Sequence, residues 1–184
     1  MKRCSLLLSL PALTLALTAC VQPTDSGQLS KQQLQTAADK LSSCDKIDAL
    51  VAGQPNGFPQ LRGALTQTRY GEIWRARYDM VGKGCEVWRG GGSGGYSYVC
   101  QRPAPDRDSG DRYYNAARDT ARNCLADKGW LEREQPRKLG VGLKTVFSKP
   151  GLDTVVAVHL IRTDGLFDNQ WSVYYMVGLP NERL

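Results

Sequence analysis

Hydrophobic positions along the chain follow two periods, one of three to four residues and one of two. The first period runs through residues 30–52, where the apolar positions are Leu34, Ala37, Ala38, Leu41, Cys44, Ile47 and Val51. This spacing places them on one stripe of a helix. Ser30 followed by Gln33 is typical of a capping box at a helix start, and the segment 53–57 (GQPNG) is a stop signal. The pattern predicts a helix over 30–52.

A second helix is predicted over residues 112–128. The positions that recur there at helical spacing are Tyr113, Ala116, Ala117, Thr120, Ala121 and Cys124. Gly129 follows directly, and glycine often ends a helix because it adopts the left-handed conformation without steric penalty. We expect the alanine-rich stripe to be the buried face.

Segments with a period of two predict strands on both sides of the second helix. Residues 69–81 place Trp74, Ala76, Tyr78 and Met80 on one face, and Arg75, Arg77 and Asp79 on the other. This alternation is typical of a half-buried strand in an antiparallel sheet. Three more strands are predicted over 141–149, 154–161 and 170–177. The segment 154–161 (TVVAVHLI) is apolar on both faces, which favours a central position.

Residues 85–100 predict a β-hairpin around the glycine-rich tip Gly90–Gly95. The register across this tip pairs Arg89 with Tyr96, Val87 with Tyr98, and Cys85 with Cys100. Opposite residues of an antiparallel pair have Cβ atoms about 4.5–5.5 Å apart, which is close enough for a disulfide after a small adjustment.

Together these elements predict an α+β fold, an antiparallel β-sheet with two main helices packed against it. The predicted order is helix, three strands, helix, three strands (α-β-β-β-α-β-β-β). Residues 30–184 are expected to form a single disulfide-stapled domain, since no internal repeat or second domain is visible.

The first 20 residues have the anatomy of an export signal. A basic head, Met1–Arg3, precedes a mostly apolar run, Leu6–Ala19, that is too short for a membrane span of about 20 residues. Leu17-Thr18-Ala19-Cys20 resembles the lipobox of bacterial lipoproteins. The resemblance implies cleavage before Cys20 and a diacylglycerol on its thiol. It makes residues 1–19 a signal peptide, and the polar segment 20–29 is expected to be a tether.

The lipobox also implies a location in the cell. Two or three palmitate-like acyl chains anchor a protein stably, whereas a single chain holds it only marginally. Val21 stands where an Asp would favour the inner membrane, so the resemblance implies the outer membrane, facing the periplasm. Removing residues 1–19 takes away Lys2, Arg3 and no acidic residue, which lowers the formal net charge from +6 to +4. Such a mildly basic, mixed charge does not indicate a nucleic-acid partner.

Four cysteines remain for the domain once Cys4 is lost with the signal and Cys20 carries lipid. An even number in an exported chain predicts disulfides, and four cysteines allow three connectivities. The hairpin register favours Cys85–Cys100. Cys44 and Cys124, both on apolar helix faces, then form the second pair. A zinc site is not expected, because the chain has no Cys-x-x-Cys spacing.

Arginine and tyrosine side chains indicate a candidate binding surface on the sheet. Arg75 and Arg77 lie two residues apart on one strand face, and we expect Tyr96 and Tyr98 to be exposed in the hairpin. Arg and Tyr are enriched at protein interfaces. The alternative is a solvated sheet face whose charges only maintain solubility.

Patterns typical of enzymes occur in the sequence, but the segments around them do not match what each motif requires. The tip matches both G-x-G-x-x-G and G-x-S-x-G, but each motif needs a helix behind it, and here a strand follows. His159 is the only histidine, and a triad with Ser93 and Asp153 has no support in matched geometry. We expect His159 to be a core or edge residue with a satisfied hydrogen bond. No catalytic residue, metal or cofactor is predicted.

The sequence therefore predicts a lipid-anchored, non-catalytic binding or assembly module for an envelope protein or a cell-wall polymer. Two alternatives stay open. One is an inhibitor or immunity protein against a cell-wall-attacking enzyme, with Gly90–Gly95 as the inserting loop. The other is an envelope hydrolase that uses His159.

Overall fold

The computed structural model describes residues 31–68, 71–90, 95–137, 140–164 and 169–180. The predictions for the signal peptide, Cys20 and the tether lie outside these ranges. The elements in chain order are α1 (Lys31–Asp39), α2 (Ser43–Gly53), the 3-10 helix η1 (Gln54–Asn56), β1 (Arg62–Thr68), β2 (Gly71–Ala76), β3 (Glu86–Arg89), β4 (Tyr96–Ala104), α3 (Arg107–Leu125), the 3-10 helix η2 (Ala126–Lys128), β5 (Leu131–Pro136), β6 (Val141–Ser148), β7 (Val155–Asp164) and β8 (Asn169–Gly178).

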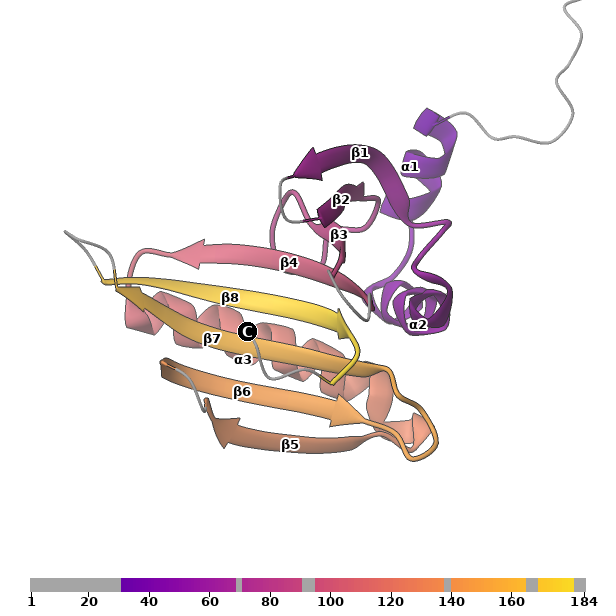
Figure 1. Cartoon of the computed structure of the whole chain (residues 1–184). Coiled ribbons are helices and arrows are strands. Elements are labelled where there is room, and N and C mark those ends of the chain that lie inside the picture. The colour runs from indigo at the N-terminus through magenta and orange to yellow at the C-terminus, as the bar shows by residue number, and fades with distance from the viewer. Residues whose placement is uncertain (1–30, 69–70, 91–94, 138–139, 165–168, 181–184) are drawn as a thin grey trace, which may run out of the picture.

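The strands form one antiparallel sheet in the order β1-β2-β3-β4-β8-β7-β6-β5. Each half of the chain thus supplies a four-stranded meander, and the two meanders join through their last strands, β4 and β8. Helix α3 lies across one face of the sheet, over β4 and β6–β8 (Figure 1). We call the opposite face of β4–β8 the open face, because no helix of the described residues covers it.

The predicted α+β class is confirmed, whereas the predicted order of two main helices and six strands needs correction. The described residues contain three α-helices and eight strands. The helix expected over 30–52 is two helices, because Ser42 caps a second start. Its Oγ accepts a hydrogen bond from the backbone N–H of Asp45 at 3.2 Å, which is the interaction that an N-cap side chain provides.

Strand β5 was not predicted from the sequence, because its helix-facing residues are acidic rather than apolar. Glu132 and Glu134 face α3, where Arg122 Nη2 donates to Glu132 Oε1 at 2.6 Å and Arg118 Nη1 donates to Glu134 Oε2 at 3.1 Å. The Tyr114 hydroxyl donates to the same oxygen of Glu134 at 3.1 Å. Arginines four apart on a helix match acids two apart on a strand, so this spacing is the signal that could have revealed β5.

The strand predicted over 69–81 is shorter than expected. It begins as β2 at Gly71, pairs with β1 as a hairpin partner, and ends at Ala76. Tyr78 is nevertheless buried and Met80 packs against the core. The Tyr98 hydroxyl holds this segment by donating to the carbonyl oxygen of Tyr78 at 3.0 Å.

Helix α3 begins earlier than predicted, because Asp106 caps it by accepting from the backbone N–H of Ser109 at 2.6 Å. Gly129 ends the helical segment in the left-handed conformation, with φ 76°. Among the predicted apolar positions, Ala116 is exposed, and Tyr114 is buried in place of Tyr113. No helix in the described part of the chain is both long and apolar enough to cross a membrane.

The core lies between the sheet and its helices, and the β4–β8 pairing crosses its centre. The register runs from Tyr98 opposite Val177 to Ala104 opposite Trp171. Large side chains that are fully buried come from both meanders, from α2 and α3, and from the α2–β1 connection: Tyr98, Tyr114, Tyr175, Phe58, Phe147, Ile47, Leu50, Leu125 and Leu160. The buried residues between the sheet and its helices therefore form one continuous hydrophobic core.

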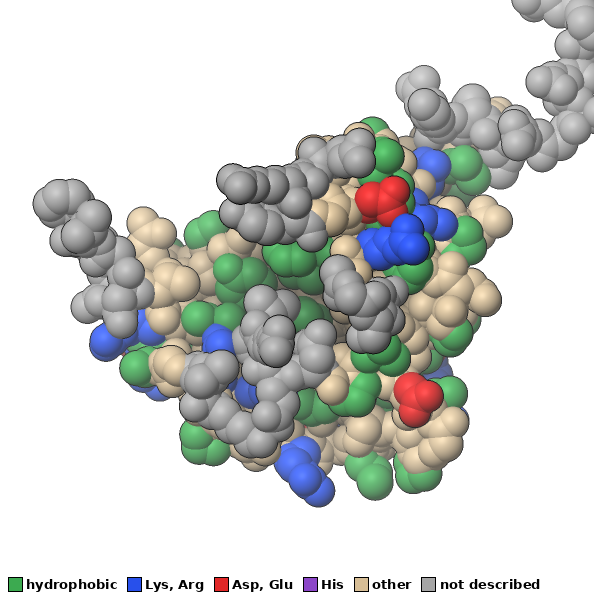
Figure 2. All heavy atoms as spheres, viewed as in Figure 1, with side chains coloured by type: hydrophobic (Ala, Val, Ile, Leu, Met, Phe, Trp, Pro, Cys, Tyr) green, Lys and Arg blue, Asp and Glu red, His purple; other side chains and the backbone are tan. Residues whose placement is uncertain are grey.

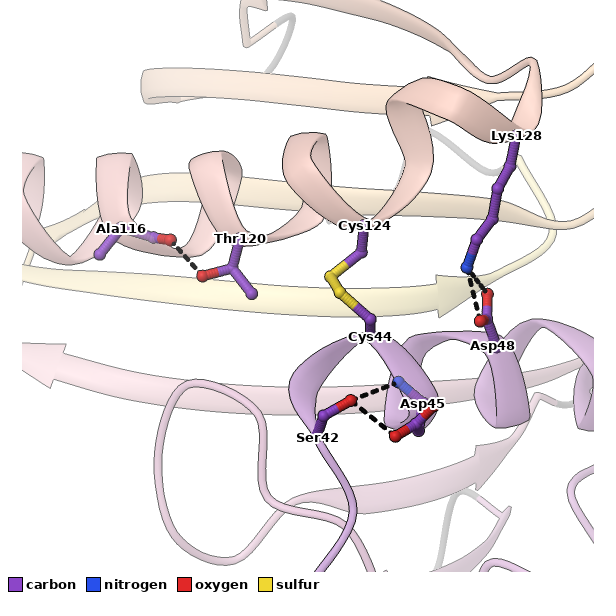
Figure 3. The surroundings of a disulfide bond; sticks show 8 residues. All are labelled: Ser42, Cys44, Asp45, Asp48, Ala116, Thr120, Cys124 and Lys128. Atoms are coloured by element: carbon purple, nitrogen blue, oxygen red, sulfur yellow. Dashed lines mark hydrogen bonds and ion pairs between the residues drawn. A yellow bond between two sulfur atoms is a disulfide. The ribbon is translucent and has the colours of Figure 1, made fainter.

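Both predicted disulfides are present. Cys44 on α2 is bonded to Cys124 on α3 with a Cα–Cα distance of 5.0 Å (Figure 3). Lys128 and Asp48 join the same two segments, with Nζ 2.6 Å from Oδ1. Cys85 and Cys100 are bonded with a Cα–Cα distance of 4.2 Å, and the predicted hairpin register is confirmed.

We expect the two disulfides to contribute unequally to stability. Cys44–Cys124 spans 80 residues and Cys85–Cys100 spans 15. The chain-entropy model assigns about 4–5 kcal/mol to the longer loop and about 3 kcal/mol to the shorter. Urea unfolding of Cys44→Ser/Cys124→Ser and of Cys85→Ser/Cys100→Ser should show the larger loss in the first variant. Equal losses would contradict this entropic ranking.

Candidate binding surface

Four side chains of the first meander form an alternating stack, which we call the arginine–aromatic ladder. Each of the strands β1–β4 contributes one member: Arg62, Trp74, Arg89 and Tyr96. The Arg62 guanidinium carbon lies 4.6 Å from the ring centre of Trp74 and 5.3 Å from that of Tyr96. Arg89 approaches the Tyr96 ring at 5.9 Å, and the two aromatic ring centres are 6.0 Å apart.

The strand registers explain why these residues meet. Trp74 lies opposite Val87, and Val87 lies opposite the buried Tyr98, so the ladder is on the same face of the sheet as the core. Tyr96 precedes Tyr98 by two residues and shares its face. The first meander extends past α3 at this point, which leaves the ladder side chains half-buried or exposed rather than fully covered.

Contacts from the α2–β1 connection fix the orientation of Tyr96. Its ring packs on Gly57, which has a left-handed φ of 70°, and a Cβ there would lie 2.7 Å from ring atoms. Gln54 Nε2 donates to the Tyr96 carbonyl oxygen at 3.3 Å, and Gln54 Oε1 accepts from the Thr154 hydroxyl at 2.8 Å. Glycine is therefore required at 57 both for its conformation and for the close approach of the ring.

The ladder carries one excess positive charge. Arg89 Nη1 donates to Glu72 Oε2 at 2.9 Å, and this hydrogen bond raises the pKa of Arg89. Arg62 forms no ion pair with a described residue. Its charge is met by two π faces instead, an interaction of about 0.5–1 kcal/mol at an exposed site and about 2 kcal/mol when desolvated. A partner that covers the ladder would therefore strengthen the cation–π contacts of Arg62.

A cleft of about 450 Å³ continues from Tyr96. Its lining comprises Gln54, Pro55, Gly95, Tyr96, Gly151, Leu152, Asp153, Thr154 and Leu179. Leu152 and Leu179 are 43% and 42% exposed, so they add apolar surface to the cleft. Ladder and cleft together offer stacking faces, apolar contact and a few charges, a composition typical of binding hot spots.

The four predicted binding residues do not form one surface. Tyr96 belongs to the ladder. The expectation that Tyr98 is exposed is wrong, because its side chain is fully buried. Arg75 lies opposite Glu86, on the sheet face away from Tyr96. Arg77 follows β2, and its buried Nε has no hydrogen-bond partner among the described residues.

His159 lies on β7, on the open face, and is only 2% exposed. Its Nδ1 has no hydrogen-bond partner within the described residues, so the expected satisfied hydrogen bond is not found at that atom. Burial first, and then the charges of Lys144 and Arg137, lower the pKa of His159 to about 3. Of the triad considered above, Ser93 lies outside the described residues, and Asp153 lines the cleft beside Tyr96.

Comparisons of the chain with models of known protein families, with curated proteins and with solved structures found no match. The assignment of the ladder and cleft as a candidate binding surface therefore rests on the contacts described above.

We expect His159 to make the domain less stable as the pH falls below 6.5. The folded pKa is lowered, so between pH 6.5 and about 3 the unfolded chain binds a proton that the folded domain does not. The free energy of unfolding should then fall by about 1.4 kcal/mol per pH unit through this group. Urea unfolding between pH 7 and pH 5 measures the slope, and His159→Gln should flatten it. An imidazole NMR signal of the folded protein that titrates near pH 6.5 would contradict the assignment.

Proposed function

We propose that this protein is a lipid-anchored binding module of the bacterial cell envelope, which holds another envelope protein on the arginine–aromatic ladder and the adjoining cleft. The observation that carries the proposal is the ladder itself. Two aromatic rings and two guanidinium groups are held in fixed contact beside exposed Leu152 and Leu179. Preordered side chains lose little conformational freedom on binding, which favours affinity.

A protein partner fits this composition better than a polymer does. Trp, Tyr and Arg are the residues most enriched among binding hot spots, and exposed apolar neighbours that exclude water strengthen them. Gly95, the last residue of the hairpin tip, lines the cleft. Residues 91–94 lie outside the described part of the chain, so the inhibitor or immunity alternative remains a prediction from the sequence.

The lipobox sequence Leu17–Cys20 supports the anchored part of the proposal. The first described helix begins at Lys31, so eleven residues, 20–30, separate the expected lipid from the domain. A chain of that length spans at most about 35–40 Å. This reach would keep the binding surface close to the membrane that carries the lipid.

We expect the Cys20→Ser variant to leave the membrane fraction. Without the thiol no acyl chain is attached, and the remaining chain relies on no other anchor in the proposal. Fractionation of cells and mass spectrometry of the mature N-terminus measure this, with the unmodified protein as the reference. A wild-type protein that begins at Met1, or that carries no lipid on Cys20, would refute the anchoring.

We expect a photo-crosslinking amino acid at Leu152 to give a discrete protein adduct in intact cells. The same group at Asn115, which is exposed on α3, serves as the positional control and should give none. Arg62→Gln and Arg89→Gln should reduce the Leu152 adduct at least about tenfold, because guanidinium contacts at hot spots typically contribute more than 1.4 kcal/mol.

Arg75→Gln is the matched control for these variants, since Arg75 is exposed on the opposite face of the same sheet region. It should leave the adduct unchanged. Equal loss in Arg75→Gln and Arg62→Gln would remove the ladder from the binding surface. A heterogeneous adduct that a muramidase digests would identify a cell-wall polymer instead of a protein.

A further inference from the structure

The open face carries a separate hollow of about 310 Å³ across β5–β8. It is lined by Arg133, Gln135, Lys144, Val146, Ser148, Val155, Ala157, His159, Met176, Gly178, Leu179 and Pro180. Figure 2 views this face and shows hydrophobic side chains gathered over β4 and β8, with Lys and Arg side chains towards β5 and β6. The lining contains cations and a histidine but no Asp or Glu among the described residues.

The strand register arranges this part of the open face into a polar row and a mainly apolar row. Gln135, Lys144, His159 and Tyr174 lie side by side across β5, β6, β7 and β8. Two residues along each strand, about 7 Å away, the next row consists of Arg133, Val146, Ala157 and Met176. Val99, Ala157 and Met176 form a small hydrophobic cluster there, with Val146 and Tyr174 packed against it. The hollow is therefore amphipathic.

The polar end of the hollow lacks a counter-charge. Lys144 in the polar row forms no ion pair with a described residue. The same holds for Arg137, which is outside the lining of the hollow but close enough to His159 to lower the pKa of the imidazole. Arg137 Nη1 and His159 Nδ1 are buried without a hydrogen-bond partner within the described ranges. Burial lowers the pKa of Arg137, which shows that the desolvated cation is unfavourable as it stands. A buried charge of this kind is normally paired.

We propose that the hollow binds a small carboxylic acid with an unbranched apolar chain. The carboxylate lies in the polar row against Lys144, Arg137 and the unpartnered nitrogen of His159, and the chain lies over Val146, Ala157 and Met176. This ligand supplies the missing negative charge and hydrogen-bond acceptors and covers the apolar floor. The polar row is on the sheet face opposite the ladder, whereas Leu179 lines both this hollow and the cleft beside Tyr96.

The size of the hollow limits the length of the chain. Its volume is at the lower end of the range for small-molecule sites. One water molecule occupies about 30 Å³ in the liquid, so the hollow has room for about ten water-sized groups. Octanoate has this number of non-hydrogen atoms, so octanoate is the matched probe.

The test is titration of octanoate into the purified soluble domain, followed by calorimetry and by NMR. We expect one site, with the largest shifts at Ala157 and Met176. Octylammonium, which has the wrong charge, and acetate, which lacks the chain, should each bind at least about tenfold more weakly. Octanoate should also raise the pKa of His159. The imidazole lies beside Tyr174, Lys144 and Arg137, and a bound carboxylate offsets the positive charges of the last two.

Lys144→Gln and Arg137→Gln should each weaken octanoate binding about tenfold. Lys83→Gln is the control for the loss of one positive charge, since the Lys83 side chain is 94% exposed and outside the lining. Arg62→Gln should leave octanoate binding unchanged, which separates this proposal from the ladder. Circular dichroism and the NMR spectrum of each variant verify that it is folded.

Four results would overturn the proposal. Equal affinity for octanoate and octylammonium would remove the anion site. Unchanged octanoate affinity in folded Lys144→Gln and Arg137→Gln would do the same. Binding that occurs only after deletion of residues 181–184 would make this segment, which contains Glu182, the occupant of the hollow. A dimer that buries the open face and excludes octanoate would identify a second copy in the same way.

Discussion

The pairing of β4 with β8 is the constraint on which the rest of the structure depends. It joins two meanders that are each continuous in sequence but meet only through strands about 70 residues apart. Without the β4–β8 pairing, α3 would cover only half a sheet. Helix α2 would then not lie beside α3, and Cys44 could not reach Cys124. Both candidate sites are also tied to it, since Tyr96 begins β4 and Met176 lies on β8.

The two faces of the sheet differ in how their arginine side chains are paired. On the helix side each of Arg118 and Arg122 contacts an acid of β5, and Arg62 and Arg89 contact aromatic rings or Glu72. On the open face Arg137 is partly desolvated and unpaired among the described residues. This unpaired arginine is one of the observations on which the proposed ligand site rests.

Much of the fold follows from local spacing, which is why the α+β class, the α3 helix, the hairpin register and both disulfides were predicted. The register of Cys85 with Cys100 follows from the length of the tip, and Cys44–Cys124 then follows by elimination. The break between α1 and α2 was missed because the apolar stripe continues through it, and only the Ser42 cap marks it. Strand β5 was missed because Glu132 and Glu134 derive their partners from a helix elsewhere in the sequence.

The candidate site was harder to predict, since it depends on which strands are neighbours. Tyr96 was predicted as a binding residue and lies in the ladder. Tyr98 shares a face with Cys100 and Val87, and this alternation already indicates burial. Arg75 was grouped with the tyrosines because the sequence does not show which face of β2 matches which face of the hairpin. That match depends on the tertiary structure. Arg62 was not considered, as β1 itself was not predicted. Spacing along one strand therefore locates faces, whereas assembling residues from four strands requires the sheet order.

The acids of β5 also decide how another molecule can approach. β5 is an outer strand of the sheet, and charged side chains that point inward from such a strand discourage a second chain from adding to it by backbone pairing. Glu132 and Glu134 are already engaged by α3, so an incoming strand could displace them only by breaking those ion pairs. Self-propagating extension of the sheet along β5 is accordingly disfavoured.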